Sequence, residues 1–359
     1  MKILILANNS DGLYKFRGEL IARLAQGNEV STSTPNDGCV DELRALGCTV
    51  IETAVDRRGI NPVTDAKLLL RYWQVLQQVK PDLVITYTIK PNIYGGMACR
   101  LLGVPYAANI TGLGTAFQKE GVLRTLVTFL YRAALKRAKV VFFENTANRD
   151  VLVGEGIVAE EKCRVLMGAG VNLAHYAPAG YPETETVRFL FVGRVMREKG
   201  VEELFAAMKR LRDEGYDCVL DVVGGYEEDY AAAICDYEAA GWLYYHGYQK
   251  DVRPFIAASH CFVLPSYHEG MANTNLECAA MARPLITSDI PGCREAVDKG
   301  VSGYLCAPQD AESLYVEMKR FLALTTEERA CMGRAGRGRM EEVFDKEKVV
   351  DATMEGLGV

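Results

Sequence analysis

The sequence predicts an α/β protein with two domains, each a parallel sheet covered by helices. Short apolar segments alternate with longer segments of helical periodicity along nearly the whole chain, the pattern of repeated strand–helix–strand units. A chain of 359 residues is long enough for two domains that each bury a core. A segment at 177–185, with two prolines and Gly180, is typical of an interdomain linker. We therefore expect domains at 1–178 and 185–343, followed by a last helix within 344–359.

The first half begins with a strand, a helix and a second strand. Its strands are expected at 1–7, 29–34, 48–52, 83–87, 106–110, 140–143 and 164–166. Its helices are expected at 13–25, 64–78, 93–102, 120–139 and 147–153. The first loop, at 8–12, lacks the G-x-G-x-x-G fingerprint, which counts against a nicotinamide or flavin enzyme.

The second half repeats the alternation after the linker. Its strands are expected at 187–192, 218–223, 243–246, 261–264, 284–287 and 303–306. Its helices are expected at 201–212, 252–258, 274–281 and 344–354, with two more that begin near residues 310 and 326.

Composition points to a globular protein without a structural metal. Hydrophobic residues make up 49% of the chain and charged residues 25%, and no run of about 18 uncharged apolar residues occurs. The 11 cysteines are scattered singly, without zinc-ligand spacing, so we expect buried free thiols in a reducing cytoplasm. The four histidines are isolated as well. No metal site is expected.

Charge divides unevenly between the two halves. Residues 1–180 hold 21 Lys and Arg against 16 Asp and Glu, whereas the remainder holds 20 against 31, consistent with the total of −6. The first half is therefore suited to an anionic partner. Its segment 119–139 combines apolar residues at helical spacing with Arg124, Arg132, Lys136 and Arg137. This helix lies on an anionic membrane surface, approaches a lipid diphosphate, or is a domain helix with a core face and a solvated basic face.

Two carboxylates lie eight positions apart in the segment VLPSYHEGMANTNLECAAMARPLI, which predicts a strand, a loop and a helix. Glu269 falls in the loop, at the carboxyl end of the strand, where ligands bind in open α/β sheets. Glu277 falls in the first turn of the helix. Thr274 and Glu277 also fit a capping box, which would give Glu277 a structural role.

Two cations follow the first strand of the second half. Arg194 comes directly after Gly193, and Lys199 precedes Gly200 at the start of a helix, whose free amides favour an anion. This arrangement predicts a site for an anion, with Arg197 as a solvated neighbour. Gly224 would allow close approach of a ligand at the end of the next strand.

The string PSYHEGMANTNLE resembles the E-x7-E loop of the retaining GT-B glycosyltransferases of family 4, and G-R-x-x-x-x-K-G resembles their diphosphate motif. Cys278 replaces the usual alanine, and Asn172 stands where Asp is commoner. The strings NITGLGTAF, TIKPNIYG and FRGEL resemble a bacterial subgroup that builds lipid-linked glycans. The resemblance implies two Rossmann-like domains facing across a cleft, with the last helix packing back on the first domain.

The resemblance also implies roles for individual residues. The catalytic residues would be Arg194, Lys199 and Glu269. The two cations would hold the diphosphate and stabilise its charge as UDP leaves. Glu269 would bind hydroxyls of the donor sugar or lie near the anomeric carbon, without acting as a covalent nucleophile. Glu277 would accept hydrogen bonds from the ribose. The remaining donor-binding residues would be Gly193, Gly224, Gly247, His268, Gly270, Met271, Ala272, Asn273 and Thr274. Residues on the acceptor side would be Gly12, Arg17, Lys90, Thr111 and Gly112.

We therefore expect a retaining, metal-independent transferase without a cofactor. It would move a sugar, an N-acetylhexosamine such as GalNAc, from a UDP donor to a saccharide on a polyprenyl diphosphate. It would work at the cytoplasmic face of an anionic membrane, and no nucleic-acid partner is expected. Two alternatives stay open, a GT-B sugar-nucleotide epimerase and a catalytically silent module that binds a nucleotide sugar.

Overall fold

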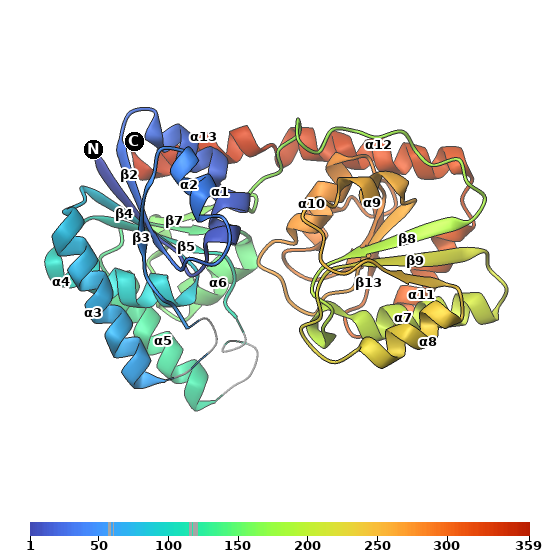
Figure 1. Cartoon of the computed structure of the whole chain (residues 1–359), viewed down its shortest axis with the longest axis horizontal. Coiled ribbons are helices and arrows are strands. Elements are labelled where there is room, and N and C mark those ends of the chain that lie inside the picture. The colour runs from blue at the N-terminus through green and yellow to red at the C-terminus, as the bar shows by residue number, and fades with distance from the viewer. Residues whose placement is uncertain (57–58, 60, 115–116, 118–120) are drawn as a thin grey trace. The chain divides into compact units, whose positions relative to one another are not determined.

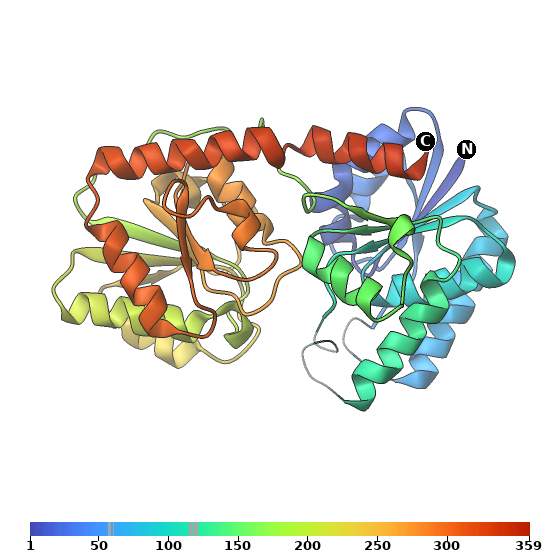
Figure 2. The ribbon, with the colours of Figure 1, turned by 180° about the vertical axis from the view of Figure 1, so that it is seen from behind.

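The computed structural model of the chain describes residues 1–56, 59, 61–114, 117 and 121–359, and it forms two compact units (Figures 1 and 2). Unit 1 comprises Met1–Ala169 and Glu347–Val359, and unit 2 comprises Gly170–Lys346. The segment 170–178, expected in the first domain, is thus part of unit 2. The amide of Val171 donates to Phe344 O (2.8 Å), and Val171 O accepts from the amide of Lys346 (3.0 Å).

Unit 1 is built on a seven-stranded parallel sheet in the order β3-β2-β1-β4-β5-β6-β7. The strands are β1 Lys2–Leu6, β2 Glu29–Thr34, β3 Thr49–Glu52, β4 Leu83–Tyr87, β5 Tyr106–Ile110, β6 Val140–Phe143 and β7 Cys163–Val165. The helices are α1 Ser10–Ala25, α2 Val40–Ala45, α3 Pro62–Val79, the π-helix η1 Pro91–Gly95, α4 Gly96–Leu102, α5 Val122–Leu135, α6 Thr146–Gly154, the 3-10 helix η3 Glu160–Lys162 and α13 Lys346–Leu357.

Alternating side chains of this sheet fill two separate cores. Leu4 and Leu6 point to one face, where they pack with residues of α3, α4 and α5. Ile3 and Ile5 point to the other face, where they pack with residues of α1, α2 and α13. This alternation follows from the two-residue period of a strand, and apolar residues on both faces require helices on both faces.

Unit 2 is built on a six-stranded parallel sheet in the order β10-β9-β8-β11-β12-β13. The strands are β8 Val187–Val192, β9 Cys218–Val223, β10 Leu243–Tyr245, β11 Cys261–Leu264, β12 Leu285–Ser288 and β13 Gly303–Cys306. The helices are the 3-10 helix η4 Arg197–Lys199, α7 Val201–Asp213, α8 Ala231–Ala239, α9 Arg253–Ala258, α10 Asn273–Ala280, the 3-10 helix η5 Arg294–Ala296, α11 Ala311–Leu322 and α12 Thr326–Val343. Helices α7, α8 and α11 lie on one side of the sheet, and α9, α10 and α12 lie on the other (Figure 1).

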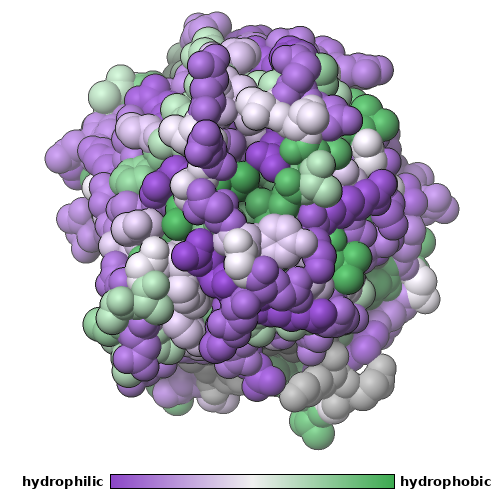
Figure 3. All heavy atoms as spheres, turned by 90° about the vertical axis from the view of Figure 1, so that its right-hand side faces the viewer, coloured by the Kyte–Doolittle hydropathy of each residue, from purple (hydrophilic) through white to green (hydrophobic). Residues whose placement is uncertain are grey.

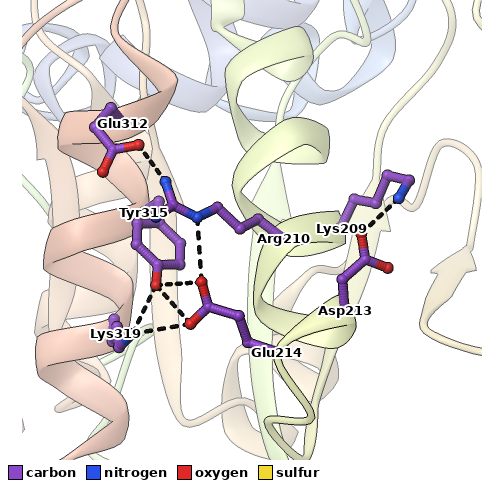
Figure 4. A network of polar contacts seen from close by, with 7 residues as sticks. All are labelled: Lys209, Arg210, Asp213, Glu214, Glu312, Tyr315 and Lys319. Atoms are coloured by element: carbon purple, nitrogen blue, oxygen red, sulfur yellow. Dashed lines mark hydrogen bonds and ion pairs between the residues drawn. The ribbon is translucent and has the colours of Figure 1, made fainter.

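A polar network joins α7 to α11 on the surface of unit 2 (Figure 4). Glu214, directly after α7, accepts hydrogen bonds from Tyr315 OH (2.7 Å) and Lys319 Nζ (2.8 Å). Arg210 contacts Glu312 and Glu214, and its guanidinium lies 3.7 Å from the centre of the Tyr315 ring. The hydrogen bond from Lys319, followed by that from Tyr315, lowers the pKa of Glu214 to about 2.

The predicted α/β architecture of two parallel-sheet domains is confirmed, but several local predictions are wrong. Helix α1 begins at Ser10, because Asn9 has the extended backbone of an N-cap, so Gly12 lies in the first helical turn instead of in a loop. Helix α5 is shorter than predicted; Lys119 and Glu120 lie outside the described residues. Helices α2 and α8 were not predicted. All cysteines are free thiols, yet Cys235 and Cys331 are exposed and not buried.

Candidate active site

Three glycine loops meet at the carboxyl ends of β8, β9 and β10. A Cβ on Gly224, whose φ is +148°, would lie 1.8 Å from Gly193 O, so only glycine fits there. The amide of Gly224 donates to Gly247 O (2.8 Å). The structure thus brings three predicted donor-binding residues together as a strip of main chain that a ligand can approach closely.

The turn that carries Lys199 is held against the loop that carries Glu269. Gly200 ends η4 with φ +72°, and a Cβ there would lie 2.1 Å from Pro265 O. Beside it, the amide of Tyr267 donates to Glu198 O (2.9 Å), and Tyr267 OH donates to Glu203 Oε1 (2.7 Å). These contacts fix the two loops as one backbone unit, since neither loop can shift without breaking them.

Lys199 and Glu269 form an ion pair across these loops. Lys199 Nζ lies 2.5 Å from Glu269 Oε1, and the two side chains are 20% and 12% exposed. The same carboxylate oxygen accepts a hydrogen bond from Ser266 Oγ (2.8 Å), and Ser266 is fully buried. A cation and a carboxylate that lie side by side can bind two neighbouring groups of a ligand. The cation can bind an anionic group, and the carboxylate can accept hydrogen bonds from hydroxyls.

Arg194 lies at the end of β8 with its side chain 52% exposed. Its Nη1 is 3.3 Å from Glu227 Oε2, a partner that the sequence did not predict. Arg197 is 68% exposed and pairs with Glu202 (3.5 Å), in line with the prediction of a solvated neighbour. His268 is exposed. Of the two predicted diphosphate-binding cations, Lys199 is thus the more enclosed and Arg194 the more accessible.

The rest of the glutamate loop leads into α10. Met271 and Ala272 are buried, and the amide of Ala272 donates to Gly292 O (2.8 Å), which lies against the backbone of Gly270. The side-chain oxygen of Asn273 is buried and has no hydrogen-bond partner among the described residues. A buried unsatisfied acceptor beside a loop of this kind is a candidate for contact with a ligand.

The capping box predicted for Thr274 and Glu277 is not formed. Helix α10 begins at Asn273, its N-cap is Ala272, and no side chain caps it, because the helix starts one residue earlier than predicted. Glu277 is instead hydrogen bonded to the side chain of Tyr176. Burial and the Glu277 carboxylate raise the pKa of the Tyr176 hydroxyl, which stays protonated and can donate to Glu277.

The predicted acceptor-side residues of unit 1 are partly engaged in internal contacts. Arg17 is buried, lies 2.5 Å from Glu144 Oε1 and stacks over the Tyr87 ring at 5.1 Å. Lys90 lies 2.7 Å from Asp65 Oδ1, with both side chains less than 15% exposed. Thr111 and Gly112 follow β5 and are partly exposed, as is Gly12. The more accessible predicted residues are therefore Gly12, Thr111 and Gly112.

The predicted membrane-contact cations on and after α5 fall into two groups. Arg124 lies 2.5 Å from Glu155 Oε1, and Arg132 donates to Glu155 O (2.7 Å), so both arginines hold α5 against the end of α6. Lys136 and Arg137 are exposed. Among the residues that the structure describes, no helix is long and apolar enough to cross a membrane, and no group of three or more metal-ligating side chains occurs.

Sequence reasoning missed Ser266, Tyr176 and Glu227. Ser266 directly follows Pro265 in the string PSYHEGMANTNLE. Its position at the end of the predicted strand could have indicated a site residue. Tyr176 was assigned to the other domain, and Glu227 lies in a loop whose path the sequence does not reveal.

Family models match both units of the chain. Residues 186–323 match the model for glycosyl transferases group 1, and residues 2–145 match that for glycosyl transferase 4-like domains. The predicted family is confirmed.

Curated relatives extend over most of the chain. One, from Campylobacter jejuni, is the N,N'-diacetylbacillosaminyl-diphospho-undecaprenol alpha-1,3-N-acetylgalactosaminyltransferase, 29% identical over 88% of this chain and 87% of that protein. Another is the UDP-Gal:alpha-D-GlcNAc-diphosphoundecaprenol alpha-1,3-galactosyltransferase of Escherichia coli, 29% identical over 71% of this chain and 70% of that protein.

Solved structures share the fold. Sucrose-phosphate synthase of Thermosynechococcus elongatus superposes with a TM-score of 0.83 at 20% identity, over 99% of this chain and 98% of that one. Anabaena Alr3699/HepE in complex with UDP and glucose superposes with a TM-score of 0.82 at 18% identity, over 100% of this chain and 99% of that one. The GT-B fold class predicted from the sequence is confirmed.

Proposed function

Because the chain belongs to the group 1 glycosyl transferases, we propose that it transfers a sugar from a UDP donor to a saccharide on a polyprenyl diphosphate, with retention of configuration. The sugar we propose is an N-acetylhexosamine such as GalNAc. The names of the C. jejuni and E. coli relatives, which act on diphospho-undecaprenol saccharides, support this choice of acceptor.

The observation that carries the proposal is the Lys199–Glu269 pair at the carboxyl ends of the unit 2 strands. When the bond between the anomeric carbon and the diphosphate breaks, negative charge develops on the leaving UDP. Lys199, with Arg194, would stabilise that charge. Electrostatic stabilisation of the transition state is the largest single contribution to rate enhancement in many enzymes. The diphosphate would compete with Glu269 for Lys199, and this would free the Glu269 carboxylate for hydroxyls of the donor sugar.

Glu277 would accept hydrogen bonds from the ribose, with Tyr176 holding the carboxylate in place. The acceptor hydroxyl would then attack the anomeric carbon on the face that UDP leaves, and its proton would pass to the departing diphosphate oxygen. This route needs no covalent sugar–enzyme intermediate. We propose that it also needs no metal ion, since two cations are available to the diphosphate.

We further propose that the reaction takes place at the cytoplasmic face of an anionic membrane, where a polyprenyl-linked acceptor is anchored. The exposed cations Lys136 and Arg137 support this, because each cation near such a surface contributes about 1 kcal/mol. Binding of this kind is reversible, so high salt should release the protein from membranes.

The test is a screen of UDP-sugars against polyprenyl-diphosphate saccharides, with UDP release and product formation both measured. We expect UDP release that depends on the acceptor and that persists in EDTA. Release of UDP and an altered sugar without any acceptor would indicate an epimerase. No turnover with any pair, despite tight UDP binding, would indicate a binding module. Loss of activity in EDTA that Mn2+ restores would contradict the metal-free route.

A further inference from the structure

Helix α5 carries an apolar stripe on its solvent side. Val122, Leu126 and Phe129 are spaced by four and three residues, so they share one face, and they are 88%, 46% and 64% exposed. The opposite face of the helix is buried in the core of unit 1 through Tyr131 and Leu135. The residues of the stripe therefore do not pack in the core of unit 1. An exposed apolar surface of this kind usually marks an interaction site.

Helix α3 adds exposed apolar side chains near α5. Leu70 and Trp73 are 56% and 39% exposed, and both helices contact η1. Of the sixteen large exposed hydrophobic residues in the described part of the chain, seven lie on these two helices: Val63, Leu70, Trp73, Val122, Leu123, Leu126 and Phe129. The face of unit 2 in Figure 3 is mainly hydrophilic, with an apolar area near its centre and smaller apolar areas around it.

The charges around this surface select its partner. Helix α5 contains no Asp or Glu, and the single acid of α3, Asp65, is paired with Lys90. Lys67, Lys136 and Arg137 are exposed. A second copy of the chain would bring the same cations to the interface and would be repelled. Two helices that carry exposed apolar side chains and cations, and no unpaired carboxylate of their own, fit an anionic lipid surface.

We propose that Leu70, Trp73, Val122, Leu126 and Phe129, here called the α3–α5 apolar surface, insert into the boundary between headgroups and acyl chains of an anionic bilayer. The inference rests on the proposed function in one respect: a lipid-linked acceptor is presented in such a bilayer. The proposal replaces binding through basic side chains alone with binding through inserted apolar side chains. Arg124 and Arg132 are structural, and insertion of apolar side chains, assisted by Lys136 and Arg137, holds the protein to the membrane.

Vesicle sedimentation tests the proposal without any acceptor. The full chain is mixed with phosphatidylcholine vesicles, with or without phosphatidylglycerol. Leu126→Ser/Phe129→Ser should lower partitioning about tenfold or more, since burial of one such side chain is worth at least that factor. The control Val301→Ser/Val316→Ser changes two exposed residues of unit 2, 60% and 48% exposed, and should bind like the wild type. Lys136→Gln/Arg137→Gln should weaken binding to the anionic vesicles only.

Tryptophan fluorescence locates the insertion. The chain has two tryptophans, Trp73 on the surface and Trp242 at 5% exposure in the core of unit 2. Brominated lipids should quench the wild type, and this quenching should disappear in Trp73→Phe. Quenching that persists in Trp73→Phe would place the insertion elsewhere and overturn the assignment.

Three further outcomes would overturn the proposal. These are wild-type protein that does not bind anionic vesicles, a serine variant that binds them like the wild type, and a wild-type dimer in lipid-free sedimentation that the serine changes dissociate. The serine variant should still act on a short, soluble acceptor analogue. If vesicle binding follows the prediction but no acceptor is ever glycosylated, the proposed function fails and the membrane surface stands.

Discussion

Replacing Lys199 with alanine tests whether its ion pair with Glu269 supports both the fold of unit 2 and the reaction. The 2.5 Å contact joins side chains that are 20% and 12% exposed, between the surface and the interior. Exposed pairs contribute about 0–1 kcal/mol and breaking a buried pair costs about 3–5 kcal/mol, so we expect Lys199→Ala to cost about 1–3 kcal/mol. In this variant Ser266 still donates a hydrogen bond to Glu269, so the loss of stability should stay below that for a fully buried pair. For a domain of this size, that lowers the unfolding temperature by about 2–10 °C.

The free-energy cost of Lys199→Ala should be larger for the reaction than for folding. Removing one charge-stabilising group costs about 10²- to 10³-fold in turnover. Scanning calorimetry and initial transfer rates measure the two effects, with Lys299→Ala as a control at an exposed lysine of unit 2. In Lys199→Ala/Glu269→Ala, much of the stability should return while turnover stays low. A Lys199→Ala protein with wild-type unfolding temperature and wild-type turnover would refute the reasoning.

Three other predictions follow from contacts of unit 2. Glu277→Ala should weaken UDP binding about ten- to a hundredfold, the value of hydrogen bonds to a charged group, while Glu269→Ala should leave UDP affinity nearly unchanged and reduce transfer. Calorimetric titration checks this, with Tyr176→Phe as the control for the lost internal contact; equal losses of UDP affinity in both glutamate variants would contradict it. Ser266→Ala should lower turnover about tenfold without changing the KM for the donor, and Ser266→Thr should restore it. A threonine variant as slow as the alanine variant would show that the hydroxyl is not what matters. Finally, the lysine and tyrosine of α11 hold the pKa of Glu214 at about 2, below its ordinary 4.5. The contribution of these contacts to the free energy of unfolding is therefore complete above about pH 4.5 and is lost as the pH falls towards 2. Glu214→Gln should flatten the pH dependence of the unfolding temperature in that window, and an unchanged profile would refute the assignment.

The sheet of each unit could be predicted from the sequence because buried parallel strands leave a clear pattern. Segments such as 187–192 and 261–264 are apolar runs that end in glycine, proline or polar residues. Helix α8 escaped prediction because it has a single buried residue, Ile234, and therefore little apolar periodicity. The predicted start of α1 was wrong because the extended backbone ends at Asn9, whose side chain makes no capping hydrogen bond, and the helix already includes Gly12.

The candidate site was predictable as a set of residues but not as a set of contacts. The motifs indicated that Lys199 and Glu269 follow strands, but only the strand order, which places β8 next to β11, brings them together. The order of strands depends on long-range packing that a single sequence does not display. The Tyr176 contact to Glu277 was missed for a related reason, since the segment 170–178 was assigned to the other domain.

The last helix has a consequence for how the protein is made. Val349, Val350 and Leu357 of α13 fill a core of unit 1, and Arg23 pairs with Glu347 and Asp351. Domains generally fold during synthesis in the order in which they emerge from the ribosome. Here α13 emerges after all of unit 2, so the part of this core that α13 covers, beside α1 and α2, stays uncovered until unit 2 has been synthesised. Until then the ribosome-bound chain exposes that apolar area, and a stop codon before residue 347 would leave it exposed permanently.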